Sequence, residues 1–292
     1  MITRLRAIAL GGPGLPALAP FYRDVWGLMP AAEADGVVYL RGTGPEHHLV
    51  ALHERPARGI VSIDFAAERG AIEAMRRALA GKGVQVTTPA TLATPGGGYG
   101  FALRDPDGRT LRVLADVAQH ADAADHDDHP RKLSHVVLNS PQMDVAKDFY
   151  CDVLGFKVSD WSEDQMVFLR CSRDHHAIAF NRLGHASLNH VAFEMRSINA
   201  YMRGIGRLKH AGHPVAWGPG RHGPGDNPFA YFPTPGGFVF EYTAELQQID
   251  EATHRPQVWQ RVPHLSDTWG TAGPPSPEIR AAMAGTPDPN QG

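Results

Sequence analysis

Apolar and polar residues of this chain follow two periods, and the two periods alternate along the sequence. Short stretches alternate apolar and polar residues as β-strands do, and longer stretches repeat apolar residues every three or four positions as helices do. In the second half, strands are expected at residues 133–138, 166–169, 177–180, 188–193, 229–232 and 238–242, and helices at residues 143–154 and 199–209. The order strand, helix and short strands occurs twice there, which predicts two β-α-β-β-β modules.

The two halves of the chain also resemble each other at a nearly constant offset. The matched pairs are RLRAIAL (4–10) with KLSHVVL (132–138), FYRDVWGL (21–28) with FYCDVLGF (149–156), IVSIDF (60–65) with LNHVAF (188–193), and DPDGRTLRVL (105–114) with TPGGFVFEYT (234–243). The first three pairs are shifted by 128 positions and the last by 129. A fixed offset indicates a duplicated unit. We therefore expect an α+β fold in which four βαβββ modules form two tandem half-open barrel domains.

The pattern places domain boundaries where the periodic segments stop. We expect an N-terminal domain at residues 1–117, a linker at 118–130, a C-terminal domain at 131–247 and a tail at 248–292. The linker contains His120, His126 and His129, which we interpret as solvated linker residues rather than a metal cluster. The tail is rich in proline and glycine but carries Trp259 and Trp269. We expect it to pack on the C-terminal domain and partly shield its cup.

Charge and cysteine content narrow the classes of partner. The net charge is −3 and no run of Lys or Arg occurs, which argues against nucleic-acid binding. No apolar run is long enough to cross a membrane. Cys151 and Cys171 form neither a zinc-type spacing nor a disulfide framework, so a cytoplasmic setting is expected. Because soluble enzymes commonly form closed homo-oligomers, we expect one here.

Three residues of the C-terminal half carry the candidate chemistry. His135, His190 and Glu241 lie within predicted strands, among apolar neighbours. A carboxylate in such a run is costly to bury unless it is paired or binds a metal. Two imidazoles and one carboxylate on one side of a metal leave positions open for substrate and O₂ on Fe(II), although the same ligands suit Mn(II). The alternative is two core histidines and a structural ion pair.

The repeat provides an internal control on that alternative. At the observed offsets, the three residues correspond to Ala7, Ser62 and Arg112 in the first half. A structural role would be expected in both copies, whereas a metal site is needed in only one. The sequence therefore predicts one metal site, in residues 131–247, and a metal-free N-terminal domain.

These motifs resemble the type I extradiol ring-cleaving dioxygenases, the catechol 2,3-dioxygenase-like members of the vicinal oxygen chelate superfamily. The resemblance covers the whole chain as architecture. It is specific in the second half, in KLSHVVLNS, LNHVAFE and the run GPGRHG that leads through Tyr231 to Glu241. In that family a histidine precedes the second ligand by one strand, where His175 lies, and a His and a Tyr precede the Glu ligand, as His222 and Tyr231 do. Ala230 departs from the larger apolar residue usual before this Tyr, which concerns the size of the substrate pocket.

The resemblance implies a reaction and a role for each residue. A catechol and O₂ would bind at Fe(II), or at Mn(II), and the ring would open to a muconic semialdehyde-type product. His175 would transfer protons, and His222 and Tyr231 would bind and orient the substrate. Asp226 and Asn227, on the loop of His222, are expected to contact substrate. His175 and His176 are adjacent on a predicted strand, so only one of them can face the metal.

Two other functions remain open from the residues. A glyoxalase-like metal-dependent isomerase or transferase would need a fourth protein ligand or a carboxylate base. It would also give no role to His175, His222 and Tyr231. A ligand-binding protein without turnover would not need three metal ligands. Metal content combined with oxygen uptake on catechols distinguishes all three functions.

Overall fold

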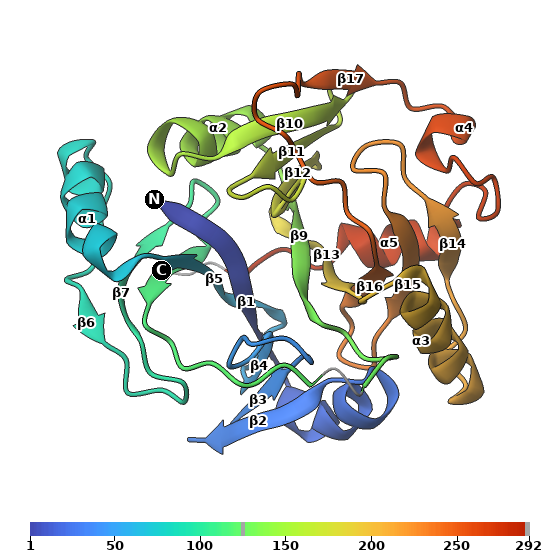
Figure 1. Ribbon diagram of the computed structural model, residues 1–292, viewed down its shortest axis with the longest axis horizontal. Helices are drawn as coiled ribbons and strands as arrows, with labels where there is room; N and C mark the ends of the chain where they lie inside the picture. Colours follow the sequence, from blue (N-terminus) through green and yellow to red (C-terminus); the bar gives the residue numbers. More distant parts are fainter. Residues whose placement is uncertain (124–125, 290–292) are drawn as a thin grey trace.

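Two mixed β-sheets lie side by side in the computed structural model, which describes residues 1–123 and 126–289 (Figure 1). The expected linker and tail thus include residues 124–125 and 290–292, which lie outside the described ranges. The first sheet contains β1 (Ile2–Gly12), β2 (Met29–Ala34), β3 (Val37–Arg41), β4 (Val50–Glu54), β5 (Gly59–Ala67), β6 (Ala90–Thr91), β7 (Tyr99–Arg104) and β8 (Thr110–Ala115). The second contains β9 (Lys132–Ser140), β10 (Lys157–Ser162), β11 (Met166–Arg170), β12 (Ile178–Arg182), β13 (Ser187–Glu194), β14 (Trp217–Arg221), β15 (Pro228–Pro233), β16 (Val239–Thr243) and β17 (Gln257–Trp259).

Helical segments connect these strands. The α-helices are α1 (Ile72–Gly81), α2 (Met143–Asp148), α3 (Ile198–His210), α4 (Pro263–Ser266) and α5 (Pro277–Ala284). Two π-helical segments, Phe21–Val25 and Phe149–Val153, occupy equivalent places in the two halves. The helix expected at residues 143–154 is therefore α2 continued by a π-helical turn.

Four βαβββ modules, made by β1–β4, β5–β8, β9–β12 and β13–β16, confirm the expected fold class. The first and last strands of each module pair in parallel, as β9 does with β12 and β13 with β16. A parallel pair needs a crossover connection, and the helical segment of each module provides it. The first strands of neighbouring modules pair antiparallel, as β1 does with β5 and β9 with β13. Each sheet thus joins two modules back to back.

The strands that the sequence pattern missed lie toward the sheet edges. β14 reads WGPGR and β17 is three residues long, and they form the two edges of the second sheet. Proline and glycine are tolerated on edge strands because one side of such a strand needs no hydrogen-bonded partner. β10 reads KVSDWS and pairs with β17, which belongs to the tail. None of these three strands has the apolar pattern of a central strand.

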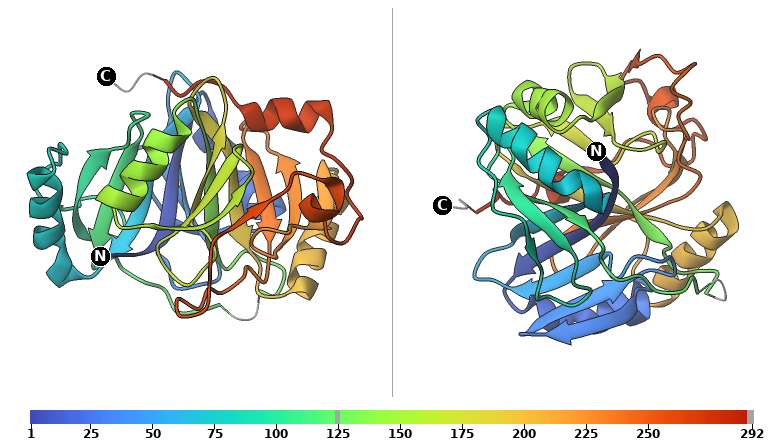
Figure 2. Two further views of the ribbon diagram at one scale, coloured as in Figure 1. Left: turned by 90° about the horizontal axis from the view of Figure 1, so that it is seen from above. Right: turned by 60° about the vertical axis from the view of Figure 1, so that its left-hand side comes forward.

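The two domains share one continuous hydrophobic core. Trp26, from the first module, is fully buried against aromatic residues of the fourth module. Its ring lies 4.1 Å from that of Tyr242, 5.3 Å from Phe240 and 5.6 Å from Phe193 (centroid distances). Figure 2 shows the sheets adjacent to each other, with the tail beside the second sheet. Neither half therefore buries its apolar surface alone.

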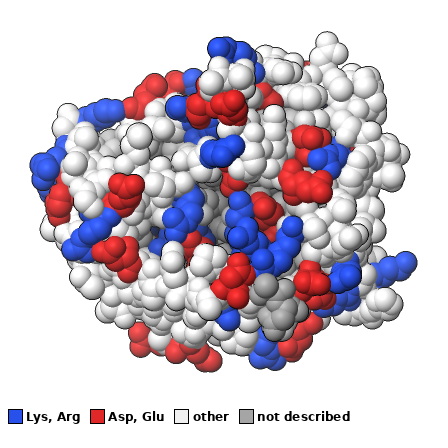
Figure 3. Space-filling model, viewed as in Figure 1, with Lys and Arg blue, Asp and Glu red and all other residues white. Residues whose placement is uncertain are grey.

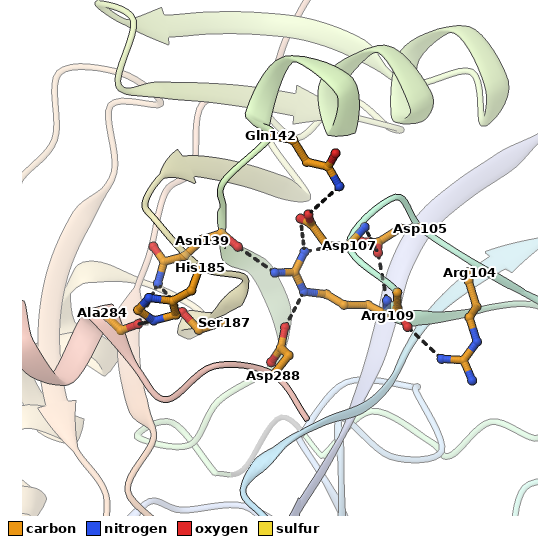
Figure 4. A network of polar contacts seen from close by, with 11 residues as sticks. Arg104, Asp105, Asp107, Arg109, Asn139, Gln142, His185, Ser187, Ala284 and Asp288 are labelled. Atoms are coloured by element: carbon orange, nitrogen blue, oxygen red, sulfur yellow. Dashed lines mark hydrogen bonds and ion pairs between the residues drawn. The ribbon is translucent and has the colours of Figure 1, made fainter. Parts of the chain in front are cut away.

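A buried arginine also joins the N-terminal domain to the tail (Figure 4). Arg109 precedes β8 and is 1% exposed. Its Nη1 donates to Asp107 at 2.9 Å, and its Nε donates to Asp288 of the tail at 2.8 Å. Its Nη2 donates to the carbonyl oxygen of Asn139, at the end of β9, at 2.6 Å. One side chain thus connects both domains and the tail.

The outer surface has mixed charge. On the face drawn in Figure 3, basic and acidic side chains are interspersed rather than gathered into a broad patch of one sign. Within the described ranges, no helix is both long and apolar enough to cross a lipid bilayer.

Candidate metal centre

The three candidate ligands lie on three adjacent strands of the second sheet. His135 is on β9, His190 on β13 and Glu241 on β16, and β13 lies between the other two. Ala192 of β13 pairs with His135 on one side and with Glu241 on the other. His190 is two residues before Ala192, so its side chain points to the same face of the sheet. The strand register therefore brings the three side chains together.

The ligand atoms converge at short distances in a buried place. Glu241 Oε2 lies 3.3 Å from His135 Nε2 and 3.1 Å from His190 Nε2. Glu241 is 0% exposed, and its Oε1 has no hydrogen-bond partner. His190 Nε2 also lacks a contact with hydrogen-bond geometry. Buried polar atoms without hydrogen-bond partners are unfavourable unless something else binds them. A divalent cation fits this set of two imidazole nitrogens and one carboxylate.

The other nitrogen of each histidine is held by a neighbouring side chain. His135 Nδ1 lies 3.1 Å from Ser134 Oγ, and His190 Nδ1 lies 2.8 Å from Asn189 Oδ1. Because the Asn189 oxygen can only accept, His190 Nδ1 carries the proton and Nε2 offers its lone pair. Partners of this kind orient metal-binding histidines in many sites.

Burial and charge set the protonation states that metal binding needs. Burial disfavours the charged form of Glu241, but the adjacent His135 and His190 hold the pKa of this carboxyl well below its ordinary value. Burial lowers the pKa of His190, against the opposing effect of Glu241. Glu241 is therefore ionised and His190 neutral near pH 7, and deprotonated ligands are the form that binds metals.

The equivalent place in the N-terminal domain contains an ion pair instead. Arg112, at the position of Glu241, donates through Nε to Asp64 Oδ1 at 2.7 Å. Ser62, at the position of His190, donates to the same oxygen at 2.9 Å. Within the described residues, the group His135, His190 and Glu241 is the one identified as able to hold a metal ion. The N-terminal half thus has the same strand arrangement but an ion pair in place of the metal ligands.

The structure corrects the expectation for the histidine beside the metal site. His176, rather than His175, lines the cavity there, and its ring centroid lies 4.1 Å from that of His135. His175 is fully buried behind it and contacts Asp160. Both residues lie in the loop before β12 and not on a strand, so strand alternation does not decide which one faces the metal site. The position beside the metal site that the sequence assigned to His175 is therefore occupied by His176.

His222 and Tyr231 lie together near His190. His222 Nε2 lies 3.0 Å from the Tyr231 hydroxyl, and the Tyr231 ring lies 5.0 Å from that of His190. His222 Nδ1 is 3.2 Å from the carbonyl oxygen of Ser266 in the tail. Burial lowers the pKa of His222 to about 4 and raises that of Tyr231, so both are neutral near pH 7.

Asp226 and Asn227 do not lie where substrate contact was expected. Asp226 accepts from Arg221 Nε at 2.7 Å and points toward solvent. Asn227 is fully buried, and its Nδ2 donates to Thr243 Oγ1 at 2.8 Å. Neither residue lines the cavity. Both residues instead hold the loop that carries His222 through these hydrogen bonds. The expected substrate contact was wrong, because the polarity of a loop does not tell which of its side chains face the cavity.

A cavity of about 510 Å³ opens in front of the triad. Its walls include Phe168, His176 and Trp217 of the second sheet and its loops. The tail provides much of the remaining wall, through Trp259, Gln260, Arg261, Pro263, Leu265, Ser266, Gly273, Pro274, Pro275, Arg280, Met283 and Ala284. Of the two tryptophans on which the expectation of a shielding tail rested, Trp259 lines the cavity, whereas Trp269 is 42% exposed and does not.

A protein-family model matches most of the chain. The model is that of the Glyoxalase/Bleomycin resistance protein/Dioxygenase superfamily, and it matches residues 4–113 and 132–242. Metapyrocatechase 2 of Cupriavidus necator is 34% identical over 165 residues, which cover 56% of this chain and 46% of that protein. The 2,2',3-trihydroxybiphenyl dioxygenase of Sphingomonas paucimobilis is 29% identical over 116 residues, or 37% of this chain and 40% of that protein. The chain thus spans under half the length of these relatives.

Solved structures agree with the family match. The Mn(II)-bound glyoxalase from Novosphingobium aromaticivorans is 44% identical, has a TM-score of 0.89, and covers 95% of this chain and 93% of its own. Homoprotocatechuate 2,3-dioxygenase from Brevibacterium fuscum has the same fold, with a TM-score of 0.83, 20% identity, and coverage of 96% and 92%. The duplicated modules and the two matched segments agree in extent. This chain belongs to the Glyoxalase/Bleomycin resistance protein/Dioxygenase superfamily.

Proposed function

We propose that this protein cleaves the ring of a catecholic compound with O₂, next to the hydroxylated carbons, at a mononuclear metal centre held by His135, His190 and Glu241. The observation that carries the proposal is a set of three protein ligands open to the cavity, with His176 beside His135 and Tyr231 beside His190. Fe(II), or Mn(II), bound there would lower the pKa of coordinated hydroxyl groups and leave positions for both catechol oxygens and O₂.

The surrounding side chains have separable tasks in this proposal. His176 Nδ1 contacts His175, so Nε2 is the ring atom free to take a proton from a substrate hydroxyl and to return it later. Because His222 Nδ1 faces the carbonyl oxygen of Ser266, its Nε2 accepts from the Tyr231 hydroxyl, whose oxygen can in turn accept from a substrate hydroxyl and orient the ring. Phe168 and Trp217 exclude water from the cavity that they line.

The cavity bears on the size of the substrate. Its volume of about 510 Å³ lies within the range of about 300–1,000 Å³ typical of sites for drug-sized ligands. Met166, Phe168 and Leu183 add apolar wall to it. A panel of test substrates should therefore include bicyclic and alkyl-substituted catechols as well as catechol itself.

A glyoxalase-type isomerase is the second candidate, because the 44% identical structural relative is called a Mn(II)-bound glyoxalase. Such a reaction would need a fourth protein ligand or a carboxylate base. None of the residues that line the cavity is Asp or Glu, and in the described part of the chain the metal group has one carboxylate, Glu241. This arrangement favours the dioxygenase over the isomerase.

The test measures metal content and two reactions on the same purified protein. We expect consumption of O₂ with at least one catechol of the panel, together with a yellow ring-opened product, after loading with Fe(II) or Mn(II). The Glu241→Ala variant serves as the matched inactive control. Turnover of a glutathione hemithioacetal without O₂ consumption would establish the isomerase instead. Catechol binding with neither reaction would establish a binding protein.

A further inference from the structure

Three side chains form a hydrogen-bonded series that leads away from the metal site. His176 Nδ1 lies 3.0 Å from His175 Nδ1, and His175 Nε2 lies 3.1 Å from Asp160 Oδ2. His175 is 0% exposed and Asp160 is 3% exposed, so water does not compete for these contacts. Only His176 reaches the cavity. The series therefore connects a buried carboxylate on β10 to the histidine that faces the substrate.

The tail holds the carboxylate at the far end of this series. The backbone N–H of Gln257 donates to Asp160 Oδ1 at 2.8 Å, and Trp259 Nε1 donates to Oδ2 at 2.7 Å. Both donors belong to β17, which pairs with β10 at the edge of the sheet (Figure 1). Burial opposes the charge of Asp160, but the hydrogen bonds of His175, Gln257 and Trp259 keep its pKa below the ordinary value. Asp160 is thus an ionised carboxylate that can only accept.

An acceptor at this end determines the proton positions along the series. His175 Nε2 must carry a proton, because Asp160 offers none. In a neutral His175 the other nitrogen, Nδ1, then accepts, so His176 Nδ1 must carry a proton in turn. This leaves the lone pair of His176 on Nε2, the atom that faces the cavity. The opposite order would place two acceptors against each other at Asp160.

The N-terminal domain contains the histidine pair without the carboxylate. His47 and His48, at the positions of His175 and His176, also have their Nδ1 atoms 3.0 Å apart. The position of Asp160 is occupied there by Ala32, on β2. The fold by itself therefore produces the contact between the two histidines. The carboxylate accompanies it only in the half that has the metal ligands.

We propose that Asp160 is a positioning residue that acts through His175 to set the tautomer of His176, so that His176 Nε2 presents its lone pair to the substrate. The proposal rests on the function proposed above, because it assigns a purpose to that lone pair. It also gives the tail strand β17 a task beyond covering the cavity, since Gln257 and Trp259 hold the Asp160 carboxylate in place.

The first arm of the test reads the tautomers directly and needs no turnover. Protein with ¹⁵N-labelled histidine is loaded with Zn(II), a diamagnetic ion that accepts imidazole and carboxylate ligands. Two-bond ¹H–¹⁵N correlations distinguish the two neutral forms of each ring, and His175→Phe and His176→Phe assign the signals. We expect the Nε2–H form of His175 and the Nδ1–H form of His176. An Nε2–H form of His176 in the parent protein overturns the proposal.

The second arm changes the carboxylate while keeping its shape. In Asp160→Asn an amide N–H₂ replaces one acceptor oxygen, so the three donors around it can no longer all be satisfied. We expect the Nε2–H form of His176 to become populated, and kcat to fall about 10–100-fold with metal content and KM little changed. Glu251→Ala is the control, because Glu251 ties the tail to Arg170 and Lys157 without touching the series.

The outcomes separate this proposal from the proposed function. If Asp160→Asn keeps the parent tautomers and matches Glu251→Ala in kcat, Asp160 is only structural and the proposal is overturned. If the parent consumes no O₂ with any catechol, the proposed function fails, while the tautomer measurement still decides the role of Asp160. If Asp160→Asn does not fold, the parent spectrum alone gives the decision.

Discussion

Glu241 is the negative charge among the three candidate ligands, and burial removes it completely from solvent. Two imidazole Nε2 atoms lie within 3.3 Å of its Oε2, but His190 is neutral and offers a lone pair there, and Oε1 has no hydrogen-bond partner. A buried carboxylate is unfavourable without a partner of opposite charge, and a bound metal cation would provide that partner here.

Replacing His135, His190 or Glu241 with alanine is therefore expected to abolish metal retention, since each provides one of three ligand atoms. Metal equivalents per chain, measured after dialysis, check this. His210→Ala is the control, because His210 is exposed and bonds only to the backbone of its own helix. A folded variant with the metal content of the parent would remove that residue from the ligand set.

The exchange of roles between the two adjacent histidines gives a second expectation. His176→Phe should keep the metal but slow turnover by about 10²–10⁴-fold, the usual range for loss of a proton-transfer group. His175→Phe should cost less, because His175 reaches the substrate only through His176. Comparison of kcat and metal content in the two variants decides between them. A more severe loss in His175→Phe would restore the assignment that the sequence suggested.

The tail elements β17 and α5 complete the second domain. β17 pairs with β10, and α5 buries Ile279 beside Phe229, Tyr231 and Val239. The tail thus makes apolar contacts with the second sheet, and other side chains of the tail form part of the cavity wall. The tail is therefore packed as a part of the C-terminal domain.

Truncation after Leu246 should lower the melting temperature and raise KM, because it exposes this apolar surface and opens the cavity. Ile279→Ala isolates the contribution of α5, and its expected cost is about 2–5 kcal/mol in the free energy of unfolding. Thermal unfolding and steady-state kinetics measure both effects. Unchanged melting temperature and KM in the truncated protein would show that the tail is dispensable.

The shared core and the Arg109 network join the two domains into one folding unit. Arg109→Ala leaves the buried carboxyl groups of Asp105, Asp107 and Asp288 without their common cation. Removing one member of a buried ionic group typically costs about 3–5 kcal/mol, which is the expected loss in the free energy of unfolding. Urea denaturation checks it, with Arg23→Ala in an exposed ion pair as control. Equal stability of the two variants would contradict a joining role.

At the scale of the whole molecule, the two duplicated halves differ at the metal site, and this difference predicts one metal ion per chain. Arg112 and Asp64 fill the N-terminal counterpart of the site, so this half should add packing and no chemistry. Elemental analysis of the purified protein should give one tightly bound equivalent. The same value is expected for Arg112→Ala, because that variant provides no ligands at Ala7 or Ser62. Two tight equivalents in the parent would refute the assignment.

The sequence by itself determined the duplicated βαβββ fold and the three candidate ligands. Both follow from local patterns: alternating apolar residues mark the strands, and the offsets of 128 and 129 show which polar residues interrupt equivalent strands in only one half. Ala7 against His135 is such a contrast, and it can be read without coordinates.

Only the tertiary structure decided which of His175 and His176 faces the metal site, that Asp160 lies behind them, and which residues of the tail line the cavity. These features depend on a loop and on edge strands with no apolar period, and on contacts such as the one between Trp259 and Asp160, 99 positions apart. Periodicity sets the face of a residue inside a strand, whereas the direction of a loop side chain is set by the neighbours that pack around it.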